Sequence, residues 1–280
     1  MLRIMTDLHG FSISALDGLI GSVRDVYFDD EAWVIRYFVV ETGGWFHRRK
    51  LLISPVAIDK SSWQAKTLLV SITKDQVQSS PDIDTERPVS RQHELSYLDY
   101  YGYAYYWSGG GLWGRGAHPG DLASGLGYGG SDVAHRRAES ENTELDADAD
   151  LEHRPHDDHH LRSCDVVMTY RVQATDGEIG SVHDLLIDAN TWAIRYLIVN
   201  TGHWWLGHKV VIPTQWITAI RWDDNTISVD LTRDAVRGAP PYQSDIPFAR
   251  TDEETIHRHY GRRGYWAEEV QQENPEFHVV

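Results

Sequence analysis

Two stretches of the chain decide its fold: DGLIGSVRDVYFDDEAWVIRYFVVETGGW, residues 17–45, and DGEIGSVHDLLIDANTWAIRYLIVNTGHW, residues 176–204. Shifting the sequence by 159 residues lays 17–107 on 176–266 without a gap, and 33 of the 91 aligned positions are identical. A fixed offset over so long a stretch indicates an internal repeat. The chain therefore consists of two copies of one module joined by a spacer.

Each copy has the pattern of short β-strands. Asp17-Gly18 and Asp176-Gly177 are hairpin turn signals, and both are followed by runs rich in β-branched and aromatic residues. Five or six short strands at roughly ten-residue spacing, with no long amphipathic helix between them, favour a small antiparallel β-barrel. The predicted fold class is therefore mainly β, with two small barrels at 1–81 and 165–240.

A short helical and aromatic tail is predicted after each barrel, at 82–107 and 241–266, followed by a C-terminal extension at 267–280. Both tails keep the same distance from their barrels and end in Tyr-Trp, at Tyr106-Trp107 and Tyr265-Trp266. The equal spacing predicts that these aromatic side chains reach fixed pockets on a barrel. Residues 108–164 are first Gly-rich and then acidic and His-rich, so we expect a disordered linker.

Composition restricts the function. The 280 residues hold 26 Lys and Arg against 42 Asp and Glu, a net charge of -16, which argues against nucleic-acid binding by phosphate neutralisation. No apolar run is long enough for a membrane span and no secretory signal is visible, so we expect a cytoplasmic protein without membrane insertion. The single cysteine, Cys164, excludes an intramolecular disulfide.

Candidate chemistry in the sequence is sparse. His153, His156, His159 and His160 form the one weak candidate for a metal site, although a His-rich tract of this kind more often binds metal without function. The repeated acids Asp25, Asp29, Asp184 and Asp188 lack the spacing of a Ca²⁺ loop and are interpreted as turn and strand-end residues. No catalytic motif is found, so the expectation is a non-enzyme without a cofactor.

Candidate contact residues lie on strands, turns and tails. Arg36 and Arg195 fall within the most apolar strand of each copy, where they are either solvated on the outer face or form a charged contact on the barrel wall. We expect Trp33 and Trp192 to be structural. The aromatic residues that are candidates for contact are Trp45, Phe46, Trp204 and Trp205 in turns, and Trp107 and Trp266 in the tails.

The runs DGLIGSVRDVYFDD, WVIRYFVVETGGW and KLLISPVAI, and the second-copy run at 176–217, resemble the PRC-barrel family. The tails resemble those of two-barrel bacterial members. The resemblance implies a six-stranded barrel used as an adaptor. Barrels of this kind cover the cytoplasmic face of the membrane subunits in the photosynthetic reaction centre, as part of its H subunit, and contribute to binding a ribosomal protein in the bacterial 16S ribosomal RNA maturation factor. The H-type N-terminal membrane helix has no counterpart here.

These observations lead to a main hypothesis and two alternatives. The main hypothesis is a non-catalytic protein–protein interaction module whose barrels pair within the chain or in a homodimer, with an unidentified protein partner. One alternative is a peripheral subunit or assembly factor of a photosynthetic or membrane complex, by analogy with the H subunit. The other is a small-molecule or metal-linked sensor or enzyme that uses a cleft between the barrels.

Overall fold

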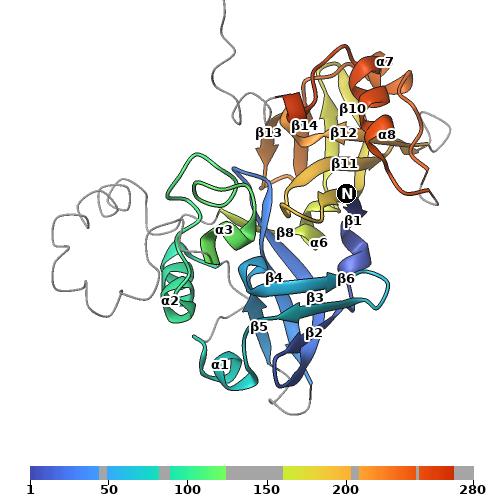
Figure 1. The fold of residues 1–280 in the computed structure, drawn as a ribbon. Helices are drawn as coiled ribbons and strands as arrows, with labels where there is room; N and C mark the ends of the chain where they lie inside the picture. The colour runs from blue at the N-terminus through green and yellow to red at the C-terminus, as the bar shows by residue number, and fades with distance from the viewer. Residues whose placement is uncertain (44–48, 82–88, 124–159, 203–207, 244–245, 268–280) are drawn as a thin grey trace, which may run out of the picture. The chain divides into compact units, whose positions relative to one another are not determined.

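The computed structural model describes residues 1–43, 49–81, 89–123, 160–202, 208–243 and 246–267 (Figure 1). The chain divides into two compact units. One, here called the N-terminal unit, comprises Asp7–Cys164 and Asn190–Ala193. The other, the C-terminal unit, comprises Met1–Thr6, Asp165–Ala189 and Ile194–Val280. Each unit is mainly β and is built around one seven-stranded sheet.

The sheet of the N-terminal unit has the strand order β5-β4-β3-β2-β7-β6, with β8 paired to β3. Neighbouring strands are antiparallel except β2 and β7, which are parallel. The strands are β2 (Ser12–Ala15), β3 (Gly18–Asp29), β4 (Val34–Thr42), β5 (Lys50–Ile53), β6 (Ile58–Ser62), β7 (Thr67–Val70) and β8 (Leu161–Ser163).

The sheet of the C-terminal unit repeats this topology. Its order is β12-β11-β10-β9-β14-β13, with β1 paired to β10 and the one parallel pair between β9 and β14. The strands are β1 (Leu2–Ile4), β9 (Arg171–Ala174), β10 (Gly177–Asp188), β11 (Ile194–Asn200), β12 (Lys209–Pro213), β13 (Ile217–Arg221) and β14 (Thr226–Val229).

Both Asp-Gly pairs lie at the expected hairpins, one residue out of the predicted register. The two-residue connections are Leu16-Asp17 and Thr175-Asp176, and each glycine pairs with the last residue of the preceding strand. Gly21 has a different role, because a Cβ there would lie 2.1 Å from the carbonyl oxygen of Glu41. The long strand β3 needs glycine at this point so that β4 can approach closely.

The first strand of each copy pairs with the other copy's long strand. Leu2–Ile4 of β1 lies antiparallel to β10, and Leu161–Ser163 of β8 lies antiparallel to β3. The offset of 159 residues relates β1 to β8, so the exchange is reciprocal. Each seven-stranded sheet therefore contains strands from both copies of the repeat.

The helices of the described chain are short. None of them combines the length and the apolar composition needed to cross a membrane. They are α1 (Lys74–Ser79), α2 (Arg91–Tyr101), α3 (Pro119–Ala123), α6 (Cys164–Val167), α7 (Arg233–Arg237) and α8 (Arg250–His259), with 3₁₀ turns η1 (Met5–Leu8), η3 (Pro55–Ala57) and η5 (Thr214–Trp216).

Helices α2 and α8 pack onto the sheets of their own units. In the N-terminal unit, the Tyr97 hydroxyl accepts a hydrogen bond from the Ser54 backbone N–H at 3.0 Å, and the rings of Tyr97 and Tyr37 lie 5.2 Å apart. In the C-terminal unit, Ile256 of α8 belongs to a buried apolar cluster with Leu2 of β1. The outer side of β4 and of β11 is thus covered by a helix rather than by water.

The Gly-rich stretch that follows Trp107 is folded, contrary to the prediction of a disordered linker from 108 to 164. Its backbone forms bridges between Gly111 and Gly114 and between Trp113 and Gly116. A Cβ on Gly111 would lie 2.5 Å from the Gly116 carbonyl oxygen, so glycine serves close backbone approach here rather than flexibility. Residues 160–164 are likewise ordered, in β8 and the start of α6, and the rest of the predicted linker lies outside the described residues.

Candidate functional site

A group of ionisable side chains lies around Arg36 of β4. Its side chain is 2% exposed, so of the two alternatives for this residue, a solvated outer face or a charged contact on the barrel wall, the first is wrong. The guanidinium donates to the Leu112 carbonyl oxygen at 2.7 Å and to the Asp29 carboxylate at 3.2 Å, and it lies 3.8 Å from the ring centroid of Tyr106. The tail and the Gly-rich stretch cover this side of the strand, which removes the water that strand alternation alone would leave there.

A buried carboxylate lies beside this arginine. Glu94 of α2 is 1% exposed and accepts a hydrogen bond from the Tyr106 hydroxyl at 2.6 Å. His160 Nε2 lies 3.0 Å from Oε2 of Glu94 and 3.0 Å from the Tyr106 hydroxyl, while Arg91 Nη1 lies 3.4 Å from the same carboxylate. We call Arg36, Arg91, Glu94, Tyr106 and His160 the buried ionic cluster.

The protonation of His160 responds to this setting. Burial by itself would lower the pKa of His160, but the hydrogen bond to Glu94 and the negative charge of that carboxylate outweigh burial, so the pKa is raised above its ordinary value. Burial raises the pKa of Tyr106 well above the usual range, and the charge of Glu94 adds to this. Tyr106 is therefore a neutral hydrogen-bond donor to the carboxylate at physiological pH.

The C-terminal unit holds a related cluster at the repeat-equivalent positions. Arg195 of β11 lies 3.9 Å from the ring centroid of Tyr265, and Arg250 lies 3.3 Å from the Glu253 carboxylate. The hydroxyl of Tyr196, on the strand, donates a hydrogen bond to Glu253 at 2.8 Å. Both units thus bury a glutamate from the helix against a tyrosine hydroxyl.

The two units obtain their histidine from different places. His160 precedes β8, whereas His257 lies on α8 itself, with Nε2 3.3 Å from the Tyr196 hydroxyl. Burial lowers the pKa of His257. One cluster therefore favours the protonated imidazole and the other the neutral one.

Of the four predicted metal candidates, one lies among the described residues. His153, His156 and His159 lie outside the described residues, and His160 belongs to the buried ionic cluster. Among the residues that the structure describes, no group of three or more His, Cys, Asp or Glu side chains could hold a metal ion. Cys164, expected in the linker, is buried in the N-terminal unit.

The repeated aspartates serve local structure and the exchanged strands. Asp25 Oδ2 accepts a hydrogen bond from the Ser163 hydroxyl at 2.7 Å, and Asp184 accepts one from the Thr6 hydroxyl. Asp29 caps the turn after β3, accepting from the backbone N–H of Glu31 at 2.9 Å. Burial raises the pKa of Asp184, while its hydrogen bonds from Thr6 oppose this shift.

The predicted aromatic candidates fall into three groups. Trp33 and Trp192 are buried, at 9% and 3% exposed, in agreement with a structural role. Trp107 and Trp266 are half-buried beside arginine side chains, with Arg91 4.0 Å from the Trp107 ring centroid and Arg250 4.4 Å from that of Trp266. The turn residues Trp45, Phe46, Trp204 and Trp205 lie outside the described residues.

An exposed apolar surface that was not foreseen lies on the sheet of the N-terminal unit. Leu16, Leu19 and Leu69 are 71%, 55% and 41% exposed, and we call them the leucine face. Ser14 of β2 pairs with Leu19 on one side and with Leu69 on the other, so the two leucines share one row across three strands. The next row of the same face consists of hydroxyl side chains: Ser22, Ser12, Thr67 and Ser62.

The same face of the C-terminal unit has a different chemistry. Thr175, Glu178 and Ser228 occupy the positions equivalent to the three leucines. The second row there carries Arg171 and Arg221 in place of serines. One copy of the repeat therefore presents a nearly uncharged face with exposed leucines, and the other a charged face.

Sequence reasoning missed Arg91 and Glu94, although a signal was present. Both residues are identical in the second copy, as Arg250 and Glu253, at the offset of 159 residues. A charged pair repeated within an otherwise variable helix indicates a shared contact, and in both units that contact is the buried carboxylate.

The comparisons with known proteins agree with this architecture. The family model described as PRC-barrel domain matches residues 6–77 and 168–236, one match in each copy and together about half of the chain. The chain belongs to the PRC-barrel domain family. It is also similar to an uncharacterized protein of Deinococcus radiodurans, with 35% identity over 93 residues that cover 31% of this chain and 33% of that protein.

Proposed function

We propose that the chain is a non-catalytic interaction module of two PRC-type barrels with helical tails, and that its N-terminal unit binds a second copy of the chain through the leucine face. The supporting observation is the contrast within the repeat: three exposed leucines stand where the other copy has threonine, glutamate and serine. Adjacent apolar side chains exposed on a sheet favour an interaction surface, because burying them is favourable.

Charge favours a second copy as the partner. The chain has a net charge of -16, so two copies repel each other at most orientations. Neither the row that contains Leu19, Ser14 and Leu69 nor the neighbouring row of hydroxyl side chains includes an acidic residue. Lys60 lies at the end of the first row, opposite Leu69. An uncharged face with a flanking lysine is where two acidic chains meet with least repulsion, and a two-fold pair places the same patch on both sides.

The buried ionic cluster supports a structural rather than a catalytic role for the charged residues. Arg36, Glu94 and His160 are each at most 3% exposed. The Arg36 guanidinium donates to Asp29 and to the Gly-rich stretch, and the Glu94 carboxylate is paired with His160. A cluster of this kind holds the tail and the residues before β8 against the sheet. These buried contacts keep the N-terminal unit rigid while the leucine face binds the second copy.

The test is sedimentation equilibrium over a range of protein concentrations, with the residues of one copy grafted onto the other. Leu16→Thr, Leu19→Glu and Leu69→Ser together reproduce the side chains of the C-terminal unit, so the fold has already accommodated them at equivalent positions. The exposed fractions correspond to about 3 kcal/mol of apolar burial in each copy, and a two-fold pair buries both faces, so the graft should weaken self-association by at least about a hundredfold.

The reverse graft is the matched control. Thr175→Leu, Glu178→Leu and Ser228→Leu give the C-terminal unit a second leucine face, and the chains should then associate beyond dimers. A wild-type chain that stays monomeric at every concentration, or a dimer that the first graft leaves unchanged, would show that the leucine face does not bind a second copy.

A further inference from the structure

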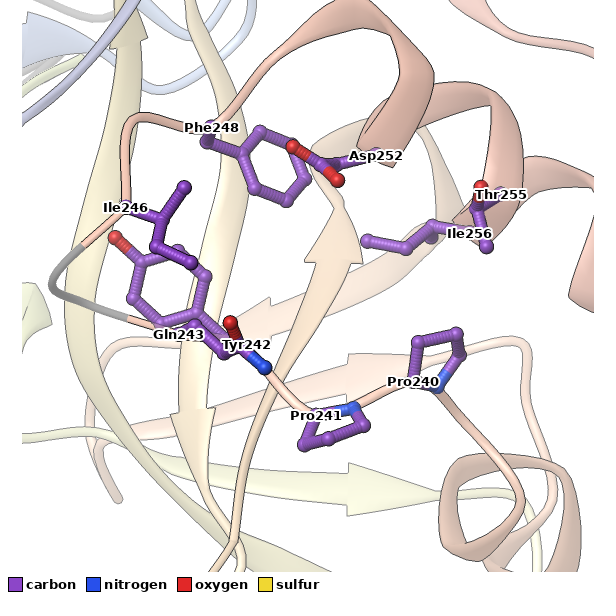
Figure 2. Close-up of a pocket in the computed structure, with 9 residues that line it drawn as sticks. All are labelled: Pro240, Pro241, Tyr242, Gln243, Ile246, Phe248, Asp252, Thr255 and Ile256. Carbon is purple, nitrogen blue, oxygen red and sulfur yellow. The ribbon is translucent and has the colours of Figure 1, made fainter.

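A small pocket lies in the C-terminal unit, between the connector that follows α7 and helix α8 (Figure 2). Its volume is about 190 Å³. The lining residues are Pro240, Pro241, Tyr242, Gln243, Ile246, Phe248, Asp252, Thr255 and Ile256.

The walls of the pocket are held by the fold of the unit. The Tyr242 backbone N–H donates to the Lys209 carbonyl oxygen of β12 at 2.7 Å, which fixes the connector against the sheet. Phe248 packs on Tyr196 with ring centroids 5.7 Å apart, and Ile256 is 4% exposed. The pocket is thus formed by side chains that the core positions, and not by a loop alone.

One charged group lines these walls. Asp252 lies in the first turn of α8, and its Oδ2 accepts a hydrogen bond from the Ala249 backbone N–H at 2.8 Å. Figure 2 shows its carboxylate beside the ring of Phe248, with Tyr242 on the connector below. Aromatic faces and a carboxylate that converge on one space are the groups that bind organic cations in proteins.

The volume of the pocket restricts which kind of organic cation can bind. Sites for drug-sized ligands and cofactors usually enclose about 300–1,000 Å³, so this pocket suits a single side chain. A guanidinium is planar, stacks on aromatic rings and donates to carboxylates in a fork, whereas an ammonium does not stack. The acidic net charge of the chain, -16, draws a basic partner toward the pocket.

We propose that this pocket binds an arginine side chain of a basic partner protein, with the stem against the prolines and Ile256, the guanidinium against the Tyr242 and Phe248 rings, whose centroids lie 6.0 Å apart, and its N–H groups on Asp252. The proposal is independent of self-association, since it concerns the C-terminal unit and a different partner. It adds a second binding specificity to the interaction module.

The experiment is a titration of the full chain with three tripeptides, followed by the chemical shifts of the Tyr242, Phe248 and Asp252 amides. The probes are acetyl-Gly-Arg-Gly-amide, the same peptide with citrulline, which is a neutral isostere of arginine, and the same peptide with lysine. The arginine peptide should saturate these shifts, and the citrulline peptide should bind about tenfold more weakly because it lacks the charge.

Two variants and a control locate the interaction. Asp252→Asn keeps the oxygen that caps α8 but removes the charge, and should weaken the arginine peptide about fivefold. Tyr242→Leu removes one aromatic face and should have a similar effect. Asp223→Asn removes an equal charge from an exposed turn outside the pocket, and should leave the affinity unchanged.

Three outcomes would overturn the proposal. Equal binding of the arginine and citrulline peptides would show that charge is not recognised, and equal binding of the lysine peptide would show that the guanidinium is not selected. Equal effects of Asp252→Asn and Asp223→Asn would show that the peptide is attracted by the net negative charge of the chain and not by the Asp252 carboxylate. Sedimentation of the wild-type chain is read separately, so failure here leaves the leucine face to its own test.

Discussion

Replacing Trp113 with alanine tests whether the Gly-rich stretch is part of the N-terminal unit. The Trp113 side chain is 1% exposed, and its indole N–H donates to the Thr191 carbonyl oxygen at 2.8 Å. Its ring centroid lies 4.8 Å from the Arg36 guanidinium, so the ring also covers one face of that buried charge. The substitution therefore opens a cavity, leaves the Thr191 carbonyl oxygen without this hydrogen-bond donor, and exposes part of the Arg36 side chain.

The magnitude follows from these contacts. Truncating a buried tryptophan costs about 3–5 kcal/mol, and a buried carbonyl that loses its only donor adds to the cost, which places Trp113→Ala at about 4–5 kcal/mol. A tryptophan in a solvated linker would cost under about 0.5 kcal/mol. The two expected losses of unfolding free energy differ by roughly tenfold, so a measurement with an error of about 1 kcal/mol distinguishes them.

Amide hydrogen exchange measures the effect in each unit separately. The slowest amides of β4 should exchange about a thousandfold faster in Trp113→Ala, because each 1.4 kcal/mol is a factor of ten. The amides of β11, in the C-terminal unit, serve as the internal reference. Trp107→Ala is the matched control: its side chain is half-buried, so its effect on β4 should be smaller. A change in β4 worth less than about 1 kcal/mol would refute a folded role for this stretch.

Four further substitutions test the two clusters and the Gly-rich stretch. Tyr196→Phe should destabilise the C-terminal unit by about 1–3 kcal/mol, because Glu253 loses a buried donor, whereas Tyr37→Phe at the equivalent position removes a hydroxyl without a hydrogen-bond partner and should be neutral or stabilising in chemical denaturation. The pKa of His160 is raised on folding, so its stabilising contribution is full below the unfolded value of about 6.5 and declines as pH rises through the folded pKa. The difference in unfolding free energy between wild type and His160→Asn should therefore shrink from acidic to alkaline pH, and a constant difference would contradict the ionic role. Gly111→Ala should cost about 1–3 kcal/mol by the same exchange measurement, because its Cβ would meet a carbonyl oxygen at 2.5 Å, and an unchanged β4 would show that the stretch can open there.

The sequence alone determined the repeat, the family and the β-rich fold. These properties depend on local patterns: Asp-Gly at hairpins, β-branched and aromatic runs between turns, and identity at one fixed offset. The helical tail predicted within 82–107 contains α2 at Arg91–Tyr101, because its Ser90 cap and its final Tyr-Gly are likewise local signals.

The tertiary structure decided which charges are buried and which strands pair. Arg36 is buried because Tyr106 of the tail and the Gly-rich stretch cover its side chain, and His160 contacts Glu94 across 66 residues of sequence. The exchange of β1 and β8 was not visible either, because both are three-residue strands with no periodicity of their own. A local sequence pattern specifies a helix or a strand. Which other element that helix or strand packs against depends on the free energy of burial summed over the whole chain, and this free energy cannot be read from a short stretch of sequence.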